Sequence, residues 1–178
     1  MEKEKYTLRH LLTKDAERYL HVKNASIFKA YIKCPLFRYV FWLRVSKTLK
    51  QRKLTKYLFA PIPVLLFRHL CYKYGLFVDP NIEIGPGLKI IHPGGIFLNA
   101  KCVGSNFTIY QGVTLGETPG KGVPVVKDNV TIYAGAKVIG NVILNPGCQI
   151  GANAVVTKDI PANTVAVGIP AVPLKRIN

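Results

Sequence analysis

The stretch VKDNVTIYAGAKVIGNVILNPGCQIGANAVV (residues 126–156) places an aliphatic side chain at every sixth position: Val126, Ile132, Val138, Leu144, Ile150 and Val156. A helix repeats near 3.6 residues and a strand near 2, so neither alone explains this period. A triangular prism of parallel strands does, because each hexapeptide forms one face and three hexapeptides complete one turn. The aliphatic side chains then stack inward as ladders.

The six-residue period extends back to residue 78. Two earlier runs contain Val103, Ile109 and Leu115, and before them Val78, Ile84, Ile90 and Ile96. Small or apolar residues recur four places after the leading aliphatic: Val130, Ala136, Val142, Cys148 and Ala154. We expect asparagines to supply turn conformations at the corners of the prism: Asn99, Asn106, Asn129, Asn141, Asn145 and Asn153. An ordinary β-sandwich would instead show alternation and irregular spacing.

The period breaks in two places. The step from Ile96 to Val103 is seven residues, and the step from Leu115 to Val126 is eleven. The second interruption, residues 117–124, is rich in Gly and Pro, so it predicts an exposed loop that leaves the prism. Sites are often built where a regular scaffold is interrupted.

Residues 1–77 lack this period and predict an α-helical segment, which separates them from a β-helix domain over residues 78–178. Helical spacing covers residues 7–20 and 35–53, and a third helix over 55–75 is expected to break at Pro61 and Pro63 and end at Gly75. The segment 1–77 holds 17 Lys and Arg against 4 Asp and Glu, so most of the net charge of +16 belongs to it.

Residues 37–53 combine four aromatic side chains (Phe37, Tyr39, Phe41 and Trp42) with six cations (Arg38, Arg44, Lys47, Lys50, Arg52 and Lys53). This combination fits a helix lying on an anionic membrane surface. The aromatic side chains could equally pack on the prism or on a neighbouring subunit. No nucleic-acid-binding motif is present. The N-terminus lacks the apolar stretch of a secretion signal, and the four cysteines show no metal-type spacing. We therefore expect a cytoplasmic protein with reduced cysteines. The membrane alternative would place it peripherally at the inner membrane face.

His92 stands out in the β-helix domain because it occupies a hexad that needs no imidazole. Pro93, Gly94 and Gly95 follow it and leave open space. His10, His21 and His69 lie in basic helical stretches and are interpreted as incidental. His92 is therefore the predicted catalytic residue.

Four segments carry a resemblance to a known family: HPGGIFLN (92–99), YQGVTLGE (110–117), VTIYAGAKVIGN (130–141) and IGANAVVTKDIPANTVAVGIPAV (150–172). Residues 78–177 resemble the left-handed β-helix acyltransferases of the hexapeptide-repeat type. Within them, the region is most similar to the serine-acetyltransferase-like branch, which includes bacterial polysaccharide O-acetyltransferases. The resemblance implies a trimer with active sites between subunits.

The resemblance also implies a mechanism. A histidine acts as general base and takes the proton of an acceptor hydroxyl as that oxygen attacks the thioester of acetyl-CoA. His92 takes this role, and an N–H near Gly94 or Gly95 is the expected oxyanion donor. The serine enzymes place an aspartate at the position of Phe77, so Asp79 is our substitute for the residue that orients the imidazole.

The same resemblance implies where acetyl-CoA binds. Gly116 matches a position near the pantetheine, and small side chains let backbone groups approach it at Ala134 and Ala152. Contacts to the nucleotide end and the phosphates are expected from Thr157, Lys158 and Lys175. No metal is expected, since a zinc hydratase on the same prism would need three histidines and this prism has only His92.

Two departures bear on the acceptor. The serine enzymes hold their substrate with an aspartate just before the catalytic histidine, where Ile91 stands, and with an Arg-His pair where Gly122 and Val123 stand. We therefore expect O-acetylation of a sugar hydroxyl in a capsular, exopolysaccharide or related glycan precursor, with a glycan or lipid-linked sugar as acceptor. Serine O-acetyltransferase of cysteine biosynthesis is the alternative. A non-catalytic scaffold would bind no CoA.

Overall fold

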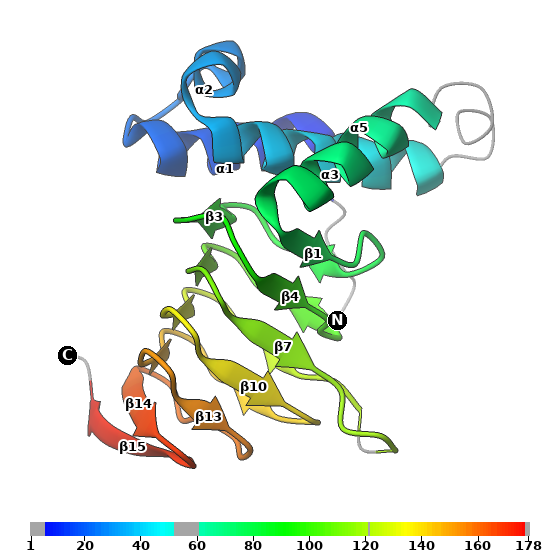
Figure 1. The fold of residues 1–178 in the computed structure, drawn as a ribbon. Coiled ribbons are helices and arrows are strands. Elements are labelled where there is room, and N and C mark those ends of the chain that lie inside the picture. Colours follow the sequence, from blue (N-terminus) through cyan, green and yellow to red (C-terminus); the bar gives the residue numbers. More distant parts are fainter. Residues whose placement is uncertain (1–5, 52–60, 121, 177–178) are drawn as a thin grey trace.

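The structure is a computed structural model and describes residues 6–51, 61–120 and 122–176. A layer of helices lies across one end of a prism of short parallel strands (Figure 1). The helices are α1 (Leu8–Leu20), α2 (Ile27–Lys33), α3 (Pro35–Gln51) and α5 (Pro61–Tyr74). The predicted β-helix of hexapeptide repeats, preceded by a helical segment, is confirmed.

Three sheets form the faces of the prism, and the chain visits them in rotation. Sheet A contains β1 (Leu76–Val78), β4 (Ile96–Leu98), β7 (Thr114–Gly116), β10 (Lys137–Ile139) and β13 (Val155–Val156). Sheet B contains β2 (Glu83–Ile84), β5 (Cys102–Val103), β8 (Val125–Val126) and β11 (Ile143–Leu144). Sheet C contains β3 (Lys89–Ile90), β6 (Thr108–Ile109), β9 (Thr131–Ile132), β12 (Gln149–Ile150), β14 (Thr164–Gly168) and β15 (Ala171–Arg176).

The hexad residues form the core. The six aliphatic residues of 126–156 are at most 1% exposed, and the small residues between them are also buried. Strand register places Val78, Leu98, Leu115, Val138 and Val156 in one ladder of sheet A. Stacking of this kind buries each aliphatic side chain against the coil above and the coil below, and burial of one such side chain is worth roughly 1.5–3 kcal/mol.

The first predicted break in the period is in the wrong place. Leu98, not Ile96, pairs with Leu115 and carries the ladder, although both side chains point inward. The chain therefore takes eight residues from Ile90 to Leu98 and five from Leu98 to Val103. The extra two residues lie in the corner that contains His92, which makes this corner longer than those below it.

Asparagine supplies left-handed backbone at part of the expected corners. Asn106, Asn129 and Asn153 have positive φ, as predicted. Asn99, Asn141 and Asn145 do not adopt this conformation. The side chain of Asn145 instead donates to the carbonyl of Ile160, 2.9 Å away. An Asn side chain can stabilise a turn by such a hydrogen bond without left-handed backbone.

The helices close the upper end of the prism with specific polar contacts. Buried Asp15 of α1 accepts the N–H groups of Gly87 and Leu88, each at 2.8 Å, and pairs with Arg44 of α3 at 3.0 Å. The hydroxyl of Tyr19 accepts the N–H of Ile90 at 2.9 Å. In the lower coils a backbone carbonyl of the preceding coil accepts the matching N–H group: Asn106 donates to Pro86 and Asn129 donates to Ser105. Helix α1 therefore takes the place of a missing coil.

Two of the aromatic side chains of α3 pack inside the molecule, and the other two, Phe41 and Trp42, are half-buried. Phe37 and Tyr39 are fully buried, and α3 and α5 share one hydrophobic core with the first coil. This arrangement agrees with the packing alternative. Pro61 and Pro63 lie in the first turn of α5, where a helix needs no backbone donors. Residues 55–60 of that predicted helix lie outside the described residues. No described helix is both long and apolar enough to cross a membrane.

Candidate active site

His92 lies in the lengthened corner between β3 and β4, where its side chain is exposed. The backbone around it is held on both sides. The N–H of Gly94 donates to the carbonyl of Tyr74, and the carbonyl of Gly94 accepts the N–H of Gly112, both at 2.8 Å. Gly94 and Gly95 have φ of 107° and 64°, which favour glycine. The backbone of the corner is therefore fixed by hydrogen bonds, while the imidazole itself is accessible.

The imidazole has only a loose aromatic neighbour. Its ring centre is 6.2 Å from that of Tyr110 in an edge-on arrangement, and Tyr110 in turn packs 5.2 Å from Tyr133. Within the described part of the chain, no hydrogen-bond partner holds the imidazole nitrogens. A nitrogen that is accessible and free of a structural hydrogen bond can accept a proton from a bound substrate.

One predicted oxyanion donor is already occupied. The N–H of Gly94 is used by the carbonyl of Tyr74, so Gly94 has no free donor. Gly95 stays as the candidate. Its backbone follows the bend that carries His92, on the side facing Gly112 of the next coil.

The predicted site residues divide between the two edges of sheet A. His92, Ala134 and Ala152 lie in the corners that lead from sheet C into sheet A, where the strands of sheet A begin. Other members of the set lie where these strands end: Asp79, Gly116, Thr157 and Lys158. The loop 117–124 also leaves from this second edge. One chain therefore does not bring the two groups together.

Lys175 lies elsewhere, in β15. This strand runs antiparallel to β14 at the far end of the prism and places Lys175 opposite Val165. Thr157 and Lys158 are exposed just after β13. Ala152 is exposed and Ala134 half-buried, as expected for small residues on an accessible corner.

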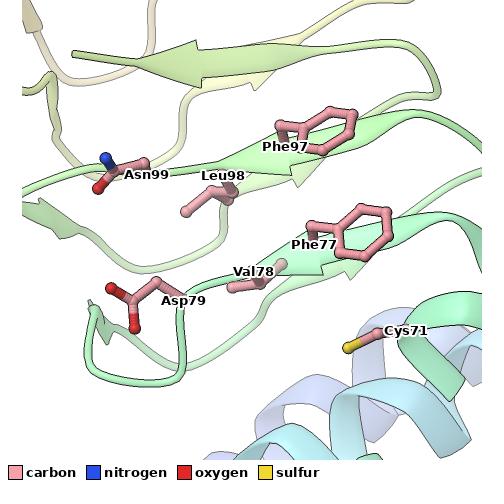
Figure 2. Close-up of a pocket in the computed structure, with 7 residues that line it drawn as sticks. All are labelled: Cys71, Phe77, Val78, Asp79, Phe97, Leu98 and Asn99. Carbon is pink, nitrogen blue, oxygen red and sulfur yellow. The ribbon is translucent and has the colours of Figure 1, made fainter. Parts of the chain in front are cut away.

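Asp79 and its surroundings form a cavity on the outer face of sheet A (Figure 2). The cavity has a volume of about 380 Å³ and combines an apolar part at Phe77 and Phe97 with a polar part at Asp79 and Asn99. The carboxylate of Asp79 accepts the N–H of Asn81 at 2.8 Å, which closes the turn after β1. Since Tyr74 precedes β1 and Asp79 follows it, the length of the strand, roughly 10 Å, separates Asp79 from the His92 corner.

Phe77 is part of an aromatic stack. Its ring lies 5.0 Å from that of Phe97 at an interplanar angle of 15°, and Tyr72 approaches its edge at 5.8 Å. Phe77 thus fills with hydrocarbon a position where the resemblance predicts a carboxylate.

The neighbouring tyrosines were missed by sequence reasoning, although the register contains the signal. Tyr110 and Tyr133 each follow an inward aliphatic residue of sheet C directly, as Ile91 follows Ile90. Side chains at this position of successive coils point outward and line the same corner of the prism. The rings of Tyr110 and Tyr133 therefore lie in the two coils that follow the His92 coil. In the described residues, no group of three or more His, Cys, Asp or Glu could hold a metal ion.

Comparison with known proteins agrees with the hexapeptide pattern. Residues 124–158 match the family model described as "Bacterial transferase hexapeptide (six repeats)". A serine acetyltransferase of Staphylococcus xylosus is 47% identical over 100 residues, which cover 54% of this chain and 46% of that protein. The match thus spans less than half of the relative's length.

Solved structures show the same architecture over nearly the whole chain. A serine acetyltransferase from Brucella abortus strain S19 superposes with a TM-score of 0.78 at 25% identity, covering 96% of this chain and 70% of that one. A serine acetyltransferase in complex with CoA gives a TM-score of 0.77 at 24% identity, covering 94% and 69%; at this identity the likeness shows the fold alone. The resemblance to the serine-acetyltransferase-like branch of the hexapeptide-repeat acyltransferases is confirmed.

These comparisons correct the expected function. We expected an acceptor sugar in a polysaccharide pathway, because Ile91 and Gly122-Val123 replace charged residues of the serine enzymes. The similar proteins are serine acetyltransferases instead, which favours the alternative over the glycan enzyme. The expected glycan acceptor and the link to polysaccharide synthesis are therefore wrong. Two substituted positions were too narrow a basis for assigning the acceptor.

Proposed function

We propose that this chain transfers the acetyl group of acetyl-CoA to the hydroxyl of serine, with His92 as general base. One observation carries the proposal: the imidazole is exposed on a fixed corner of the β-helix, in a chain that is 47% identical to a serine acetyltransferase over 100 residues. Acetyl-CoA is a cytoplasmic metabolite, so we place the reaction in the cytoplasm.

The chemistry needs a single proton carrier. A neutral imidazole accepts the proton of the serine hydroxyl while that oxygen forms a bond to the thioester carbonyl carbon. The carbon–sulfur bond then breaks, and the imidazolium returns the proton to the sulfur of CoA. General base catalysis of this kind contributes roughly 10²–10⁴ to the rate. The N–H of Gly95 is our candidate to stabilise the negative charge on the carbonyl oxygen.

We further propose a homotrimer in which each site lies between two prisms. The division of the predicted residues over the two edges of sheet A supports this arrangement. One subunit would offer the edge with His92, Ala134 and Ala152. Its neighbour would offer the opposite edge with Gly116, Thr157 and Lys158, and acetyl-CoA would lie along the groove between them.

The acceptor is tested by an acetyl-transfer assay. Purified protein is mixed with acetyl-CoA and L-serine, the released CoA thiol is followed, and the product is identified by mass spectrometry. L-Alanine is the matched control, since it differs from serine only by the hydroxyl. We expect thiol release that saturates with serine and yields O-acetylserine. Equal thiol release with alanine would contradict the proposal, and absence of CoA binding would favour a non-catalytic scaffold.

A further inference from the structure

A second cavity lies in the helical layer. It has a volume of about 180 Å³ and lies between α3 and α5, with one residue from α2. Two cationic side chains, Arg38 and Lys73, and the imidazole of His69 line it, together with the aromatic rings of Tyr31, Trp42 and Tyr74. None of the residues that line it is acidic. The cavity therefore has a uniformly basic and aromatic lining.

Helical spacing brings these groups to one place. Arg38 and Trp42 are four residues apart on α3, and His69 and Lys73 are four apart on α5, so each pair lies on one face of its helix. Arg38 is half-buried, and no ion pair to its guanidinium is present in the described part of the chain. A half-buried guanidinium without an acidic partner is a strong site for an external anion, because it offers several fixed N–H donors.

The aromatic side of the cavity supplies a further donor. The indole N–H of Trp42 donates to the hydroxyl oxygen of Tyr31 at 3.1 Å. Because that oxygen accepts from the indole, the proton of the Tyr31 hydroxyl is free for another acceptor. The ammonium of Lys73 lies 5.7 Å from the centre of the Tyr74 ring. The polar groups of the cavity are thus mainly donors, and its walls are ring faces and aliphatic carbons.

We propose that this groove binds a small organic anion: one carboxylate or phosphate group attached to an apolar body the size of a single ring. Arg38 and Lys73 bind the charged group, and Trp42 and Tyr74 contact the apolar body. The size agrees with the volume, since an engineered cavity of about 150 Å³ binds benzene.

The groove also borders the predicted active site. Tyr74 ends α5, and its carbonyl accepts the N–H of Gly94 in the His92 corner. Binding itself, however, is independent of the proposed acetyl transfer, so it is tested without substrates. The chain contains one tryptophan, and it lies in this groove. Its fluorescence therefore reports occupancy directly.

The test titrates the full chain with benzoate, phenyl phosphate, inorganic phosphate and benzyl alcohol, following Trp42 emission and the heat of binding. We expect saturable binding of benzoate or phenyl phosphate. Inorganic phosphate and benzyl alcohol should each bind at least about tenfold more weakly than these two ligands. Equal affinity for inorganic phosphate would contradict the proposed contact with an apolar body. Equal affinity for benzyl alcohol would contradict the proposed binding of an anionic group.

Variants locate the site. The substitution Arg38→Gln should weaken binding of benzoate or phenyl phosphate about tenfold. Lys73→Gln, at an exposed position, should do the same independently. Arg68→Gln is the matched control, because Arg68 is an exposed cation on the same helix that does not line the groove. Retained affinity in Arg68→Gln supports a built site. A loss in Arg68→Gln as large as in Lys73→Gln would show attraction to the overall positive charge and would overturn the proposal.

Discussion

The carboxylate of Asp79, in the turn after β1, could either orient the imidazole of His92 or stabilise the turn itself. We expected Asp79 to orient His92 in place of the aspartate that the resemblance puts at Phe77, whereas the structure gives its carboxylate the N–H of Asn81 as a partner at 2.8 Å. Sequence spacing could not decide between them, because it does not show that β1 separates the two residues within one chain. Because Phe77 stands where the resemblance implies an aspartate, we chose Asp79 as the nearest acidic residue along the chain. Residues that are close in sequence need not be close in space.

At this position we expect the substitution Asp79→Asn to have a small effect on catalysis. An amide oxygen can still accept the N–H of Asn81, so the turn should persist and the turnover number should stay within about threefold of the native value. Steady-state kinetics with acetyl-CoA and serine would measure this. A hundredfold loss of turnover with unchanged thermal stability would instead assign Asp79 a catalytic role.

The His92 corner was predictable in identity but not in shape. A lone imidazole in an aliphatic ladder, followed by two glycines, was sufficient to single out the residue. Its extra length was not found, because Ile96 and Leu98 both point inward and either could have continued the period. Only the pairing of Leu98 with Leu115 decides between them.

At the scale of elements, the prism was predictable because its period is encoded in every coil. The helical layer was less so. Helix α2 was not expected, and the sequence did not indicate that α1 would supply acceptors to the first coil. Such contacts depend on Asp15 meeting Gly87 and Leu88, which lie 72 and 73 residues away in sequence.

The junction between α1, α3 and the first coil should contribute strongly to stability. Asp15→Asn removes the negative charge beside buried Arg44, which lies 3.0 Å away. Because an uncompensated buried charge is costly, we expect the free energy of unfolding to fall by about 3–5 kcal/mol. Chemical denaturation followed by circular dichroism would measure it.

Glu17→Gln is the control for that experiment. Glu17 lies on the same helix and pairs with Lys14 at 2.8 Å near the surface, where such pairs contribute less than about 1 kcal/mol. Equal losses in the two variants would contradict the idea that Asp15 replaces a missing coil.

For the whole molecule, alkaline stability should depend on a thiol in the core. Cys148 is fully buried, and burial raises the pKa of its thiol to about 12. In the unfolded chain a thiol ionises near pH 8.5. Between these two values the unfolded state loses a proton that the folded state keeps, so the free energy of unfolding falls by about 1.4 kcal/mol per pH unit. Below pH 8.5 this contribution is constant.

Comparison with Cys148→Ala isolates that effect. From pH 8 to pH 10, the native chain should lose about 2 kcal/mol more than the variant, as measured by urea denaturation at each pH. Half-buried Cys102→Ala serves as a reference for the removal of a thiol that the solvent reaches. Parallel losses in the native chain and in Cys148→Ala would contradict a protonated thiol in the core.

The most direct measurement of the central claim is CoA release from acetyl-CoA with L-serine as acceptor, in the native chain and in His92→Ala. His10→Ala is the matched control, an exposed histidine on α1. We predict that His92→Ala lowers turnover by at least about a hundredfold, while the native mass of the assembly and the activity of His10→Ala are unchanged. Full turnover in His92→Ala would contradict the assignment of this imidazole as the general base.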